Sequence, residues 1–414
     1  MKIAFFVWEY WPRLVGGLGT YAIEITKKFE EFGHEVTVFT LNDGNLKTLE
    51  KWNGIEIHRP MLVDSSVVFP LFIREDLKRW GTHLKFFSDI FSYNYLSASK
   101  FINLLIRKNG EKFDVVAFHD WLSAFAGAII EKEMPSLPTV FHIHSIEEQR
   151  ALGGGSQIIK EIEREAAKGA DTIITVSYSM KDFLVSLGYP QEKINVCYNG
   201  CDPEKYNPKK VNKERVEDLR KLYRIKPEEK VILFVGRLTA VKGVYNLVKA
   251  MPLVLEEFPN TKLIILGKGE QYQDLITLIQ QLNIAEKVYI RSEWVSEEER
   301  ILHYALADLC VFPSLSEPFG IVSLEAMAME KPVVVGASGI SGLREQVIPS
   351  GPERTGVHID GNKSEDIAWG IKEVLRNFEE AKKWGKNGRK RVLKEFTWEI
   401  AAKRTLEIYE KISK

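Results

Sequence analysis

The chain has 414 residues, which is longer than one hydrophobic core usually supports, so two domains are expected. Its 57 Lys and Arg residues balance its 57 Asp and Glu residues, and this disfavours a nucleic-acid-binding protein because no net field attracts a polyanion. The apolar run that opens the chain is too short for a signal peptide or a transmembrane segment, so a cytoplasmic protein is expected.

Short runs of β-branched and aromatic residues alternate with amphipathic helical patterns along the whole chain, which predicts an α/β fold with parallel sheets. One clear helix follows Gly17 and is expected to end near Gly33. The aromatic tract from Trp80 to Phe101 is interpreted as helical core rather than as a membrane or carbohydrate platform. Strands in the first half are predicted at residues 2–9, 35–40, 54–59, 114–119, 138–144, 172–177 and 194–199.

A linker is predicted at residues 199–214, where apolar periodicity is lost and Pro, Asn and Lys gather, with a boundary near residue 205. The chain ends in a helix from Phe396 whose broad apolar face must be buried against another surface. Two doubly wound, Rossmann-like sheets joined by one linker imply a ligand cleft between the domains. Strands in the second half are predicted at residues 230–236, 261–267, 287–292, 308–314, 331–336 and 356–359.

A glycine-rich loop, RLVGGLGTYA, joins the first predicted strand to the helix that follows it. Gly16 and Gly17 allow the backbone to approach a phosphate, and the helix N-terminus adds free N–H groups. The loop also fits the G-x-G-x-x-A pattern of a dehydrogenase, with Asp43 after the second strand. That interpretation is disfavoured because residues 10–15 separate the glycines from the strand, and a flexible loop without a ligand is a further alternative.

A second loop, FVGRLTAVKGV, carries Arg237 and Lys242 between a strand and a helix. Both cations can face the cleft and bind a diphosphate from the side opposite Gly17. Because the chain has no D-x-D pair to hold Mg²⁺ or Mn²⁺, no metal and no cofactor are expected. Solvated surface cations are the alternative. The cysteines, which lack a metal-binding spacing, are predicted to be reduced and structural: Cys197, Cys201 and Cys310.

Two glutamates, Glu317 and Glu325, stand eight residues apart in SEPFGIVSLE. On one helix, positions eight apart diverge by about 80°, so the two acids are not expected to share a helix face. Glu317 is placed in a loop over the cleft, and Glu325 in the first turns of a helix, where it can bind a vicinal diol such as ribose. Solvated charges near a helix N-terminus are the alternative. Backbone N–H groups expected to point at the ligand are those of Phe319, Gly320, Ile321 and Val322.

Histidines end two of the predicted strands, His119 in VVAFHDW and both His142 and His144 in FHIHSIE. Each is of a type that donates to substrate hydroxyls or stabilises a developing charge. A histidine satisfied within the core is the alternative for each, and for His142 it has at least equal support.

Together these residues resemble the retaining, nucleotide-sugar-dependent glycosyltransferases of the GT-B fold, in the large group that includes glycogen synthases and sucrose-phosphate synthases. The resemblance covers nearly the whole chain. It implies an acceptor-side domain of residues 1–205, a donor-binding domain of residues 206–396 and a crossover helix of residues 397–414 that returns to the first domain. The motifs that carry it are VGGLG, GRLTAVKG, the E-x7-E motif EPFGIVSLEAM, VSYSMKDFLVSLGYPQEKINVCYNGCDPEKYNP and FTWEIAAKRTLEIYEKI.

The resemblance also implies roles for single residues. Gly17 would line the donor phosphates, Arg237 and Lys242 would bind the diphosphate, Glu325 the ribose and Glu317 the transferred sugar. His119 would lie near the reacting sugar, and His144 joins the donor-binding set. The expected catalytic residues are therefore Glu317, His119, Arg237 and Lys242.

Two positions depart from the glycogen synthase pattern. Leu14 and Leu122 stand where those enzymes usually have a lysine and a second histidine, which argues against assuming an α-glucan acceptor. Arg13 is a candidate to reach the phosphate that the missing lysine would bind. Acceptor choice is assigned to first-domain loops such as residues 60–100, which carry no readable motif.

The expected reaction is retaining transfer of a hexose, with glucose as first candidate, from a UDP-, ADP- or GDP-linked sugar to a hydroxyl acceptor such as an α-glucan. The leaving diphosphate is expected to take the acceptor's proton. Three rivals are a sugar-nucleotide 2-epimerase of the same architecture, a phosphorylase that would need pyridoxal phosphate, and a non-catalytic nucleotide-sugar-binding protein.

Overall fold

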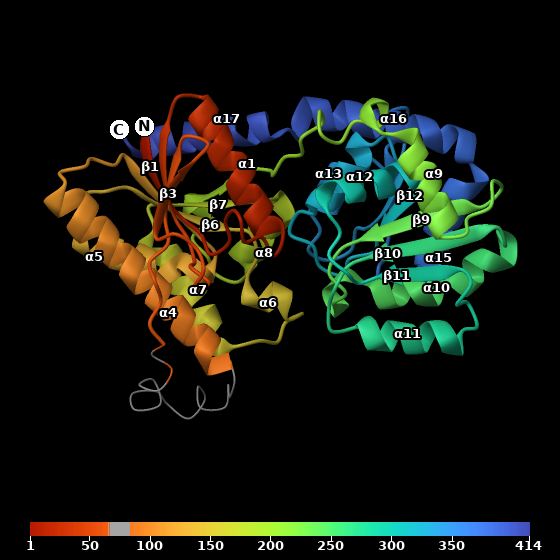
Figure 1. Ribbon diagram of the computed structural model, residues 1–414, viewed down its shortest axis with the longest axis horizontal. Helices are drawn as coiled ribbons and strands as arrows, with labels where there is room; N and C mark the ends of the chain where they lie inside the picture. The colour runs from red at the N-terminus through yellow and green to blue at the C-terminus, as the bar shows by residue number, and fades with distance from the viewer. Residues whose placement is uncertain (65, 67–82) are drawn as a thin grey trace.

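The computed structural model describes residues 1–64, 66 and 83–414, which form two lobes that lie side by side (Figure 1). Each lobe holds a mainly parallel sheet covered by helices, as the alternation of patterns predicts. Trp80, at the start of the predicted aromatic tract, lies outside the described residues. So do residues 65 and 67–82 of the predicted acceptor region.

The first sheet has the strand order β3-β4-β2-β1-β5-β6-β7-β8. Neighbours are parallel except for β3, which pairs antiparallel with β4 and was not predicted. Its signal in the sequence was the Asn53-Gly54 pair, whose φ angles of 47° and 80° suit a two-residue hairpin turn. The strands are β1 (Lys2–Phe6), β2 (Glu35–Phe39), β3 (Leu49–Trp52), β4 (Ile55–His58), β5 (Val115–His119), β6 (Thr139–Ile143), β7 (Thr172–Thr175) and β8 (Ile194–Val196).

Helices cover both faces of this sheet. The helix predicted after Gly17 is α1 (Gly17–Glu31), which buries Tyr21, Ile25 and Phe29. The aromatic tract forms α4 (His83–Ser99), where one face is core but Phe86 and Tyr95 are exposed, so the core prediction is confirmed for one face only. The other helical segments are η1 (Lys100–Lys108), η2 (Trp121–Ser123), α5 (Ala124–Glu133), α6 (Glu147–Arg150), α7 (Gln157–Gly169), α8 (Tyr178–Ser186) and η3 (Gln191–Lys193).

The second sheet is wholly parallel, with the order β11-β10-β9-β12-β13-β14. The order reverses between β9 and β12, and in such sheets the loops at the carboxyl ends beside this point form the ligand crevice. The strands are β9 (Lys230–Val235), β10 (Thr261–Leu266), β11 (Val288–Arg291), β12 (Leu309–Phe312), β13 (Val333–Gly336) and β14 (Gly356–Ile359).

Helices also flank the second sheet, and its central strands are buried on both sides, which explains their continuous apolar runs. Its helical segments are η4 (Pro208–Lys210), α9 (Lys213–Leu222), η5 (Ala240–Lys242), α10 (Val244–Glu257), α11 (Tyr272–Gln281), α12 (Glu297–Leu306), α13 (Ile321–Ala328), α14 (Leu343–Gln346), α15 (Ser364–Arg376) and α16 (Phe378–Glu395).

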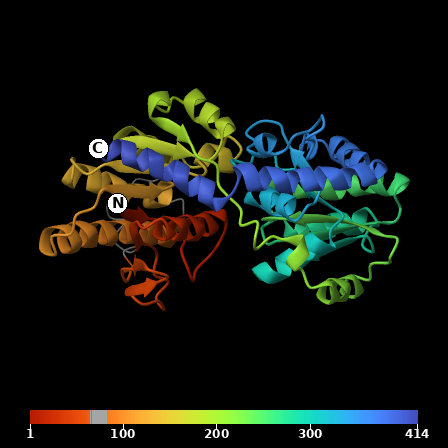
Figure 2. The ribbon, with the colours of Figure 1, turned by 90° about the horizontal axis from the view of Figure 1, so that it is seen from above.

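The last helix, α17 (Trp398–Ile412), crosses back to the first lobe. Figure 2 shows α16 and α17 in blue, running almost end to end over both lobes. The apolar face of α17 packs among first-lobe residues through Trp398, Leu406 and Tyr409. The chain passes between the lobes twice, and the two connecting segments are in contact. A Cβ on Gly200 would stand 2.3 Å from the Trp398 backbone N, so only glycine fits there.

Two further predictions concern single residue types and membrane segments. Cys197, Cys201 and Cys310 are buried free thiols, as expected. Among the described residues, no helix combines the length and the apolarity that a bilayer crossing requires.

Candidate active site

The glycine loop and α1 form one wall of the candidate site. Gly16 precedes α1 without any side-chain cap, so the first N–H groups of the helix are free for an anion. The N–H groups of Val15 and Gly16 donate to the Glu9 carboxylate at 3.1 and 2.9 Å. Glu9 therefore helps to fix the glycine loop, and it was not predicted from the sequence.

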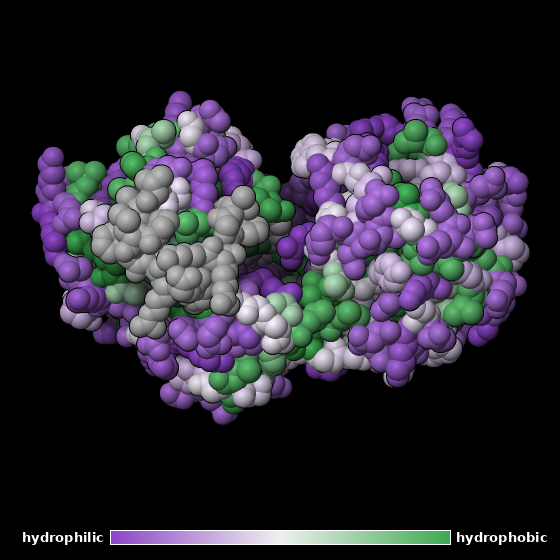
Figure 3. Space-filling view, turned by 90° about the horizontal axis from the view of Figure 1, so that it is seen from below, coloured by the Kyte–Doolittle hydropathy of each residue, from purple (hydrophilic) through white to green (hydrophobic). Residues whose placement is uncertain are grey.

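This wall faces the second lobe directly. A Cβ on Gly17 would lie 3.9 Å from Cδ1 of Ile321, the first residue of α13, so the N-termini of α1 and α13 meet across the cleft. Figure 3 shows the molecule hollowed between the two lobes. The structure therefore brings Gly17 and Ile321 together, as the predicted site requires.

At the carboxyl ends of β9 and β12, Lys242 forms an ion pair with Glu317. Ser314 Oγ donates to the same carboxylate at 3.3 Å. Two loops hold the pair in place, since the N–H of Leu315 donates to the Val241 carbonyl at 2.8 Å. Lys242 and Glu317, 75 positions apart in sequence, thus form one charged unit.

Arg237, predicted as the second diphosphate ligand, is exposed at the end of β9. It makes no hydrogen bond or ion pair with any described part of the chain. Because the guanidinium carries a fixed positive charge and planar N–H donors, it is free to bind an anionic ligand.

The start of α13 contains the four residues whose backbone was predicted to face the ligand. Gly320, with φ of 94°, precedes the helix without a side-chain cap, and Phe319 is buried beneath it. Ile321 reaches the other lobe, while the Val322 carbonyl accepts a hydrogen bond from Tyr304 at 3.2 Å. The free N–H groups at this helix start form a second place where an anion is favoured.

Glu325 is more enclosed than its predicted ribose role requires. The residue is only 4% exposed, and its carboxylate accepts hydrogen bonds from Tyr206 at 2.9 Å, Arg300 at 3.1 Å and Tyr304 at 2.8 Å. Burial lowers the pKa of Arg300, but the Glu325 carboxylate, Tyr206 and Tyr304 together outweigh this effect and the pKa is raised. A bound ribose would have to share Glu325 with these partners, none of which carried a sequence signal.

His119 and His144 present unused nitrogens at the end of the first sheet. His119 Nδ1 donates to the Phe6 carbonyl at 2.9 Å, so its Nε2 carries the lone pair, and that atom is buried without a partner. His144 Nε2 is likewise buried and unpartnered. Burial lowers the pKa of His119 far below its usual value and that of His144 to about 3. Both rings are therefore neutral at pH 7, and His119 is an acceptor for a hydroxyl rather than the donor we expected.

His142 serves the core. Its two nitrogens lie 3.3 Å from the Tyr21 hydroxyl and 2.7 Å from the Tyr409 hydroxyl of α17. The alternative interpretation of a satisfied core histidine is the one that these contacts support.

The three histidines place ring nitrogens within 4.8 Å of one another, which raises the question of a metal. His119 and His142 are stacked at 4.4 Å with planes inclined by only 21°, and His142 and His144 by 14°. A metal lies about 2.0–2.1 Å from each nitrogen in the plane of each ring, and nearly parallel planes share no such point. As arranged, the trio does not fit a metal, and the expected absence of one remains a prediction.

Asp120, directly after His119, is a second residue that sequence reasoning missed. Its backbone has φ of 52° and ψ of 178°, a strained conformation for a residue other than glycine. Its carboxylate accepts the N–H of His144 at 2.7 Å and that of Ser145 at 3.3 Å. Burial raises its pKa to about 6, although Arg150 opposes the shift. Asp120 thus holds the loop that carries His144.

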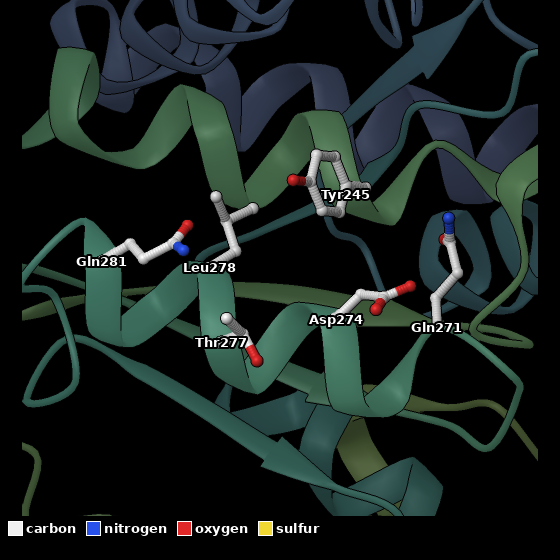
Figure 4. A pocket seen from close by; sticks show the side chains of 6 residues that line it. All are labelled: Tyr245, Gln271, Asp274, Thr277, Leu278 and Gln281. Carbon is white, nitrogen blue, oxygen red and sulfur yellow. The ribbon is translucent and has the colours of Figure 1, made fainter.

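A separate hollow of about 380 Å³ lies between α10 and α11 (Figure 4). It contains none of the predicted site residues and no cation among its lining side chains, so it is not a diphosphate site. Its lining consists of Tyr245, Gln271, Asp274, Thr277, Leu278 and Gln281.

Each of the two lobes matches a known protein family. Residues 15–205 match Glycosyltransferase Family 4, and residues 215–391 match Glycosyl transferases group 1. An uncharacterized glycosyltransferase of Methanocaldococcus jannaschii is 33% identical over 416 residues, covering 99% of this chain and 98% of that protein. A glycogen synthase of Mycobacterium tuberculosis is 28% identical over 417 residues, covering 99% and 94%. An α-maltose-1-phosphate synthase of Mycolicibacterium smegmatis is 32% identical over 326 residues, covering 74% and 81%.

Solved structures share the fold over the whole length. Sucrose-phosphate synthase from Thermosynechococcus elongatus superimposes with a TM-score of 0.77 at 23% identity, covering 99% of this chain and 98% of that one. The catalytic domain of starch synthase IV from Arabidopsis thaliana gives 0.78 at 17% identity, covering 100% and 99%. The architecture is GT-B, as the resemblance implied. The chain belongs to the group 1 glycosyltransferase family.

Proposed function

We propose that the protein transfers a hexose from a nucleoside-diphosphate sugar to a hydroxyl acceptor with retention of the anomeric configuration. The observation that carries this proposal is the facing of Gly17 and Ile321, which sets the uncapped N-termini of α1 and α13 beside the Lys242–Glu317 pair. Such a site favours a diphosphate with a sugar attached.

In the proposed reaction the bond from the anomeric carbon to the diphosphate oxygen breaks, and a bond to the acceptor oxygen forms on the same face of the sugar. Arg237, Lys242 and the two helix starts stabilise the charge that develops on the diphosphate. The diphosphate takes the acceptor's proton. Glu317 accepts hydrogen bonds from the sugar, and the neutral Nε2 atom of His119 accepts one from the opposite side.

The names of related proteins support the donor class. Homologous folds were solved with ADP and acarbose in the starch synthase, and with UDP-glucose in the HepE protein of Anabaena. Glycogen synthase and α-maltose-1-phosphate synthase among the relatives favour glucose as the sugar and an α-glucan or a phosphorylated glucose as acceptor.

Arg13 supports this donor class at the position where a lysine is missing. Leu14 is 50% exposed, whereas the neighbouring Arg13 guanidinium lies over the Trp8 ring at 5.7 Å and its Nη1 is buried without a partner. An unpaired buried N–H donor is costly, so a phosphate oxygen at this atom would be strongly favoured. We infer that Arg13 replaces the lysine.

The test is to incubate the purified protein with UDP-, ADP- and GDP-glucose, each with and without maltooligosaccharides or glucose 1-phosphate. Release of nucleoside diphosphate that depends on the acceptor is expected, together with an α-linked product by NMR. Sugar epimerisation without an acceptor would indicate the 2-epimerase instead. Tight donor binding without any turnover would indicate a sensor and overturn the proposal.

A further inference from the structure

One contact between the lobes has no role in the reaction described so far. Glu345 belongs to α14 of the second lobe, yet its carboxylate accepts the N–H groups of Tyr178 at 3.0 Å and Ser179 at 2.6 Å. These are the first two residues of α8, on the side of the first lobe that faces the second (Figure 1). Tyr198, just before the linker, donates its hydroxyl to the same carboxylate at 2.9 Å.

This contact is a charged cap supplied by another domain. Within α8, Ser177 caps only the N–H of Met180, so Glu345 satisfies the donors that remain. A carboxylate at a helix N-terminus is favoured by the helix dipole, and charge-assisted hydrogen bonds are about twice as strong as neutral ones. Ser179 Oγ adds a second tie, because it accepts the N–H of Ser341 at 2.9 Å.

Residues 340–342, which directly precede α14, are also in contact with Glu317. The N–H of Glu317 donates to the Ile340 carbonyl at 2.8 Å, and the N–H of Gly342 donates to the Glu317 carbonyl at 2.8 Å. A Cβ on Gly342 would stand 2.4 Å from the Pro318 carbonyl oxygen, so the two backbones are in close contact. Residues 340–342 are therefore fixed to Glu317 on one side and to α8 on the other.

We propose that Glu345 is a positioning residue, which sets Glu317 relative to the histidines of the first lobe. The inference rests on the proposed function, in which the sugar is held by Glu317 from one lobe and by His119 and His144 from the other. A shift of about 1 Å between such groups can cost on the order of 10²-fold in rate. The binding of a nucleoside diphosphate without an attached sugar depends on Arg237 and Lys242. Glu345 contacts neither of these residues.

The test compares Glu345→Gln with Glu353→Gln, the same substitution at an exposed position of the same lobe. In Glu345→Gln an amide N–H₂ faces the N–H donors of α8, and its neutral oxygen accepts them more weakly. We expect kcat to fall by about 10- to 100-fold. The dissociation constant of the nucleoside diphosphate, measured by calorimetry, is expected to stay within about twofold of wild type. Ser179→Ala, which removes the hydrogen bonds from the Ser341 N–H and the Arg344 guanidinium but leaves Glu345 in place, is expected to lower kcat less.

Small-angle X-ray scattering of the diphosphate-bound proteins gives a readout that is independent of turnover. Glu345→Gln is expected to give a wider spread of lobe arrangements, and Glu353→Gln the wild-type curve. An unchanged kcat, or equal losses in kcat and in diphosphate affinity, would overturn the inference. If wild type transfers no sugar, the proposed function fails, and identical scattering curves for wild type and Glu345→Gln would then overturn the positioning role separately.

Discussion

The two walls of the cleft differ in charge. The first-lobe wall is neutral where the two histidines lie, because His119 is buried, His144 is half-buried, and each keeps a buried nitrogen without a partner. The second-lobe wall is charged, with the Lys242–Glu317 and Arg300–Glu325 pairs already formed and Arg237 exposed. A neutral acceptor recognises a sugar hydroxyl without competing for the phosphates, whereas paired and free cations suit a diphosphate. Substitutions in the charged wall are therefore expected to lower kcat more than substitutions in the neutral wall.

The largest expected effect is on the cations. Arg237→Ala and Lys242→Ala are each expected to lower kcat by about 10² to 10³, because each removes a donor that would stabilise the leaving diphosphate in the proposed reaction. Steady-state kinetics with the best donor is the measurement. Lys249→Ala, at an exposed lysine of α10, is the matched control and should leave kcat unchanged. Near-normal turnover in both site variants would mean that the charged wall does not act on the leaving group.

The second prediction divides the two glutamates. Glu317→Gln is expected to lower kcat by about 10², because in the proposed reaction its carboxylate binds the transferred sugar, and it also pairs with Lys242. Glu325→Gln is expected mainly to weaken donor binding. It also weakens the pair with Arg300, so thermal unfolding must be measured beside the dissociation constant. Equal losses of both kinetic parameters in both variants would contradict the division of roles.

The third prediction uses pH to examine the core behind the neutral wall, where His142 stacks against His119 at 4.4 Å. Burial holds the pKa of His142 well below its usual 6.5, so below pH 6.5 the unfolded chain binds a proton that the native state does not. Stability is therefore lost as pH falls, by about 2 kcal/mol for this group at pH 5. Urea unfolding at pH 7 and pH 5 should show a loss larger by that amount in wild type than in His142→Asn.

Other buried groups do not disturb this difference. Burial raises the pKa of Asp120 to about 6 and that of Glu163 to about 7, and both shifts stabilise the native state as pH falls. They act in the opposite direction but are present in both proteins, so they cancel in the comparison. Parallel pH curves for wild type and His142→Asn would show that His142 accepts a proton in the folded state.

The smallest expected effect is at the glycine loop. Gly17→Ala should leave unfolding within about 0.5 kcal/mol of wild type, because the new Cβ meets only Ile321 at 3.9 Å. We expect donor affinity to fall by about 3- to 10-fold, which is on the order of 1 kcal/mol, because the Cβ blocks the approach of a phosphate. Lys249→Ala is again the control, since Lys249 is an exposed residue of α10 that is not part of the site. Equal donor affinity in both variants would remove Gly17 from the phosphate site.

Much of the architecture was readable in advance. Continuous apolar runs predicted the buried parallel strands β9 and β10, and the helical spacing of apolar residues predicted the amphipathic helix α1. Both patterns reflect local geometry. The loop residues Lys242 and Glu317 were also predicted to face one cleft, since the carboxyl ends of parallel strands share one edge. The edge strand β3 was missed because it is short and half exposed, although Asn53-Gly54 marked its turn.

The amino-acid sequence by itself determined the two parallel sheets, the glycine loop, and the strand ends that carry the acids, cations and histidines. Only the tertiary structure decided which of these groups are free. Glu325 is enclosed by Tyr206, Arg300 and Tyr304, His142 by two tyrosines, and Glu345 caps a helix of the other lobe. The physical reason is that periodicity reports which face of an element is buried. Hydrogen-bond partners hundreds of positions away, such as Tyr409 for His142, leave no trace in a local pattern.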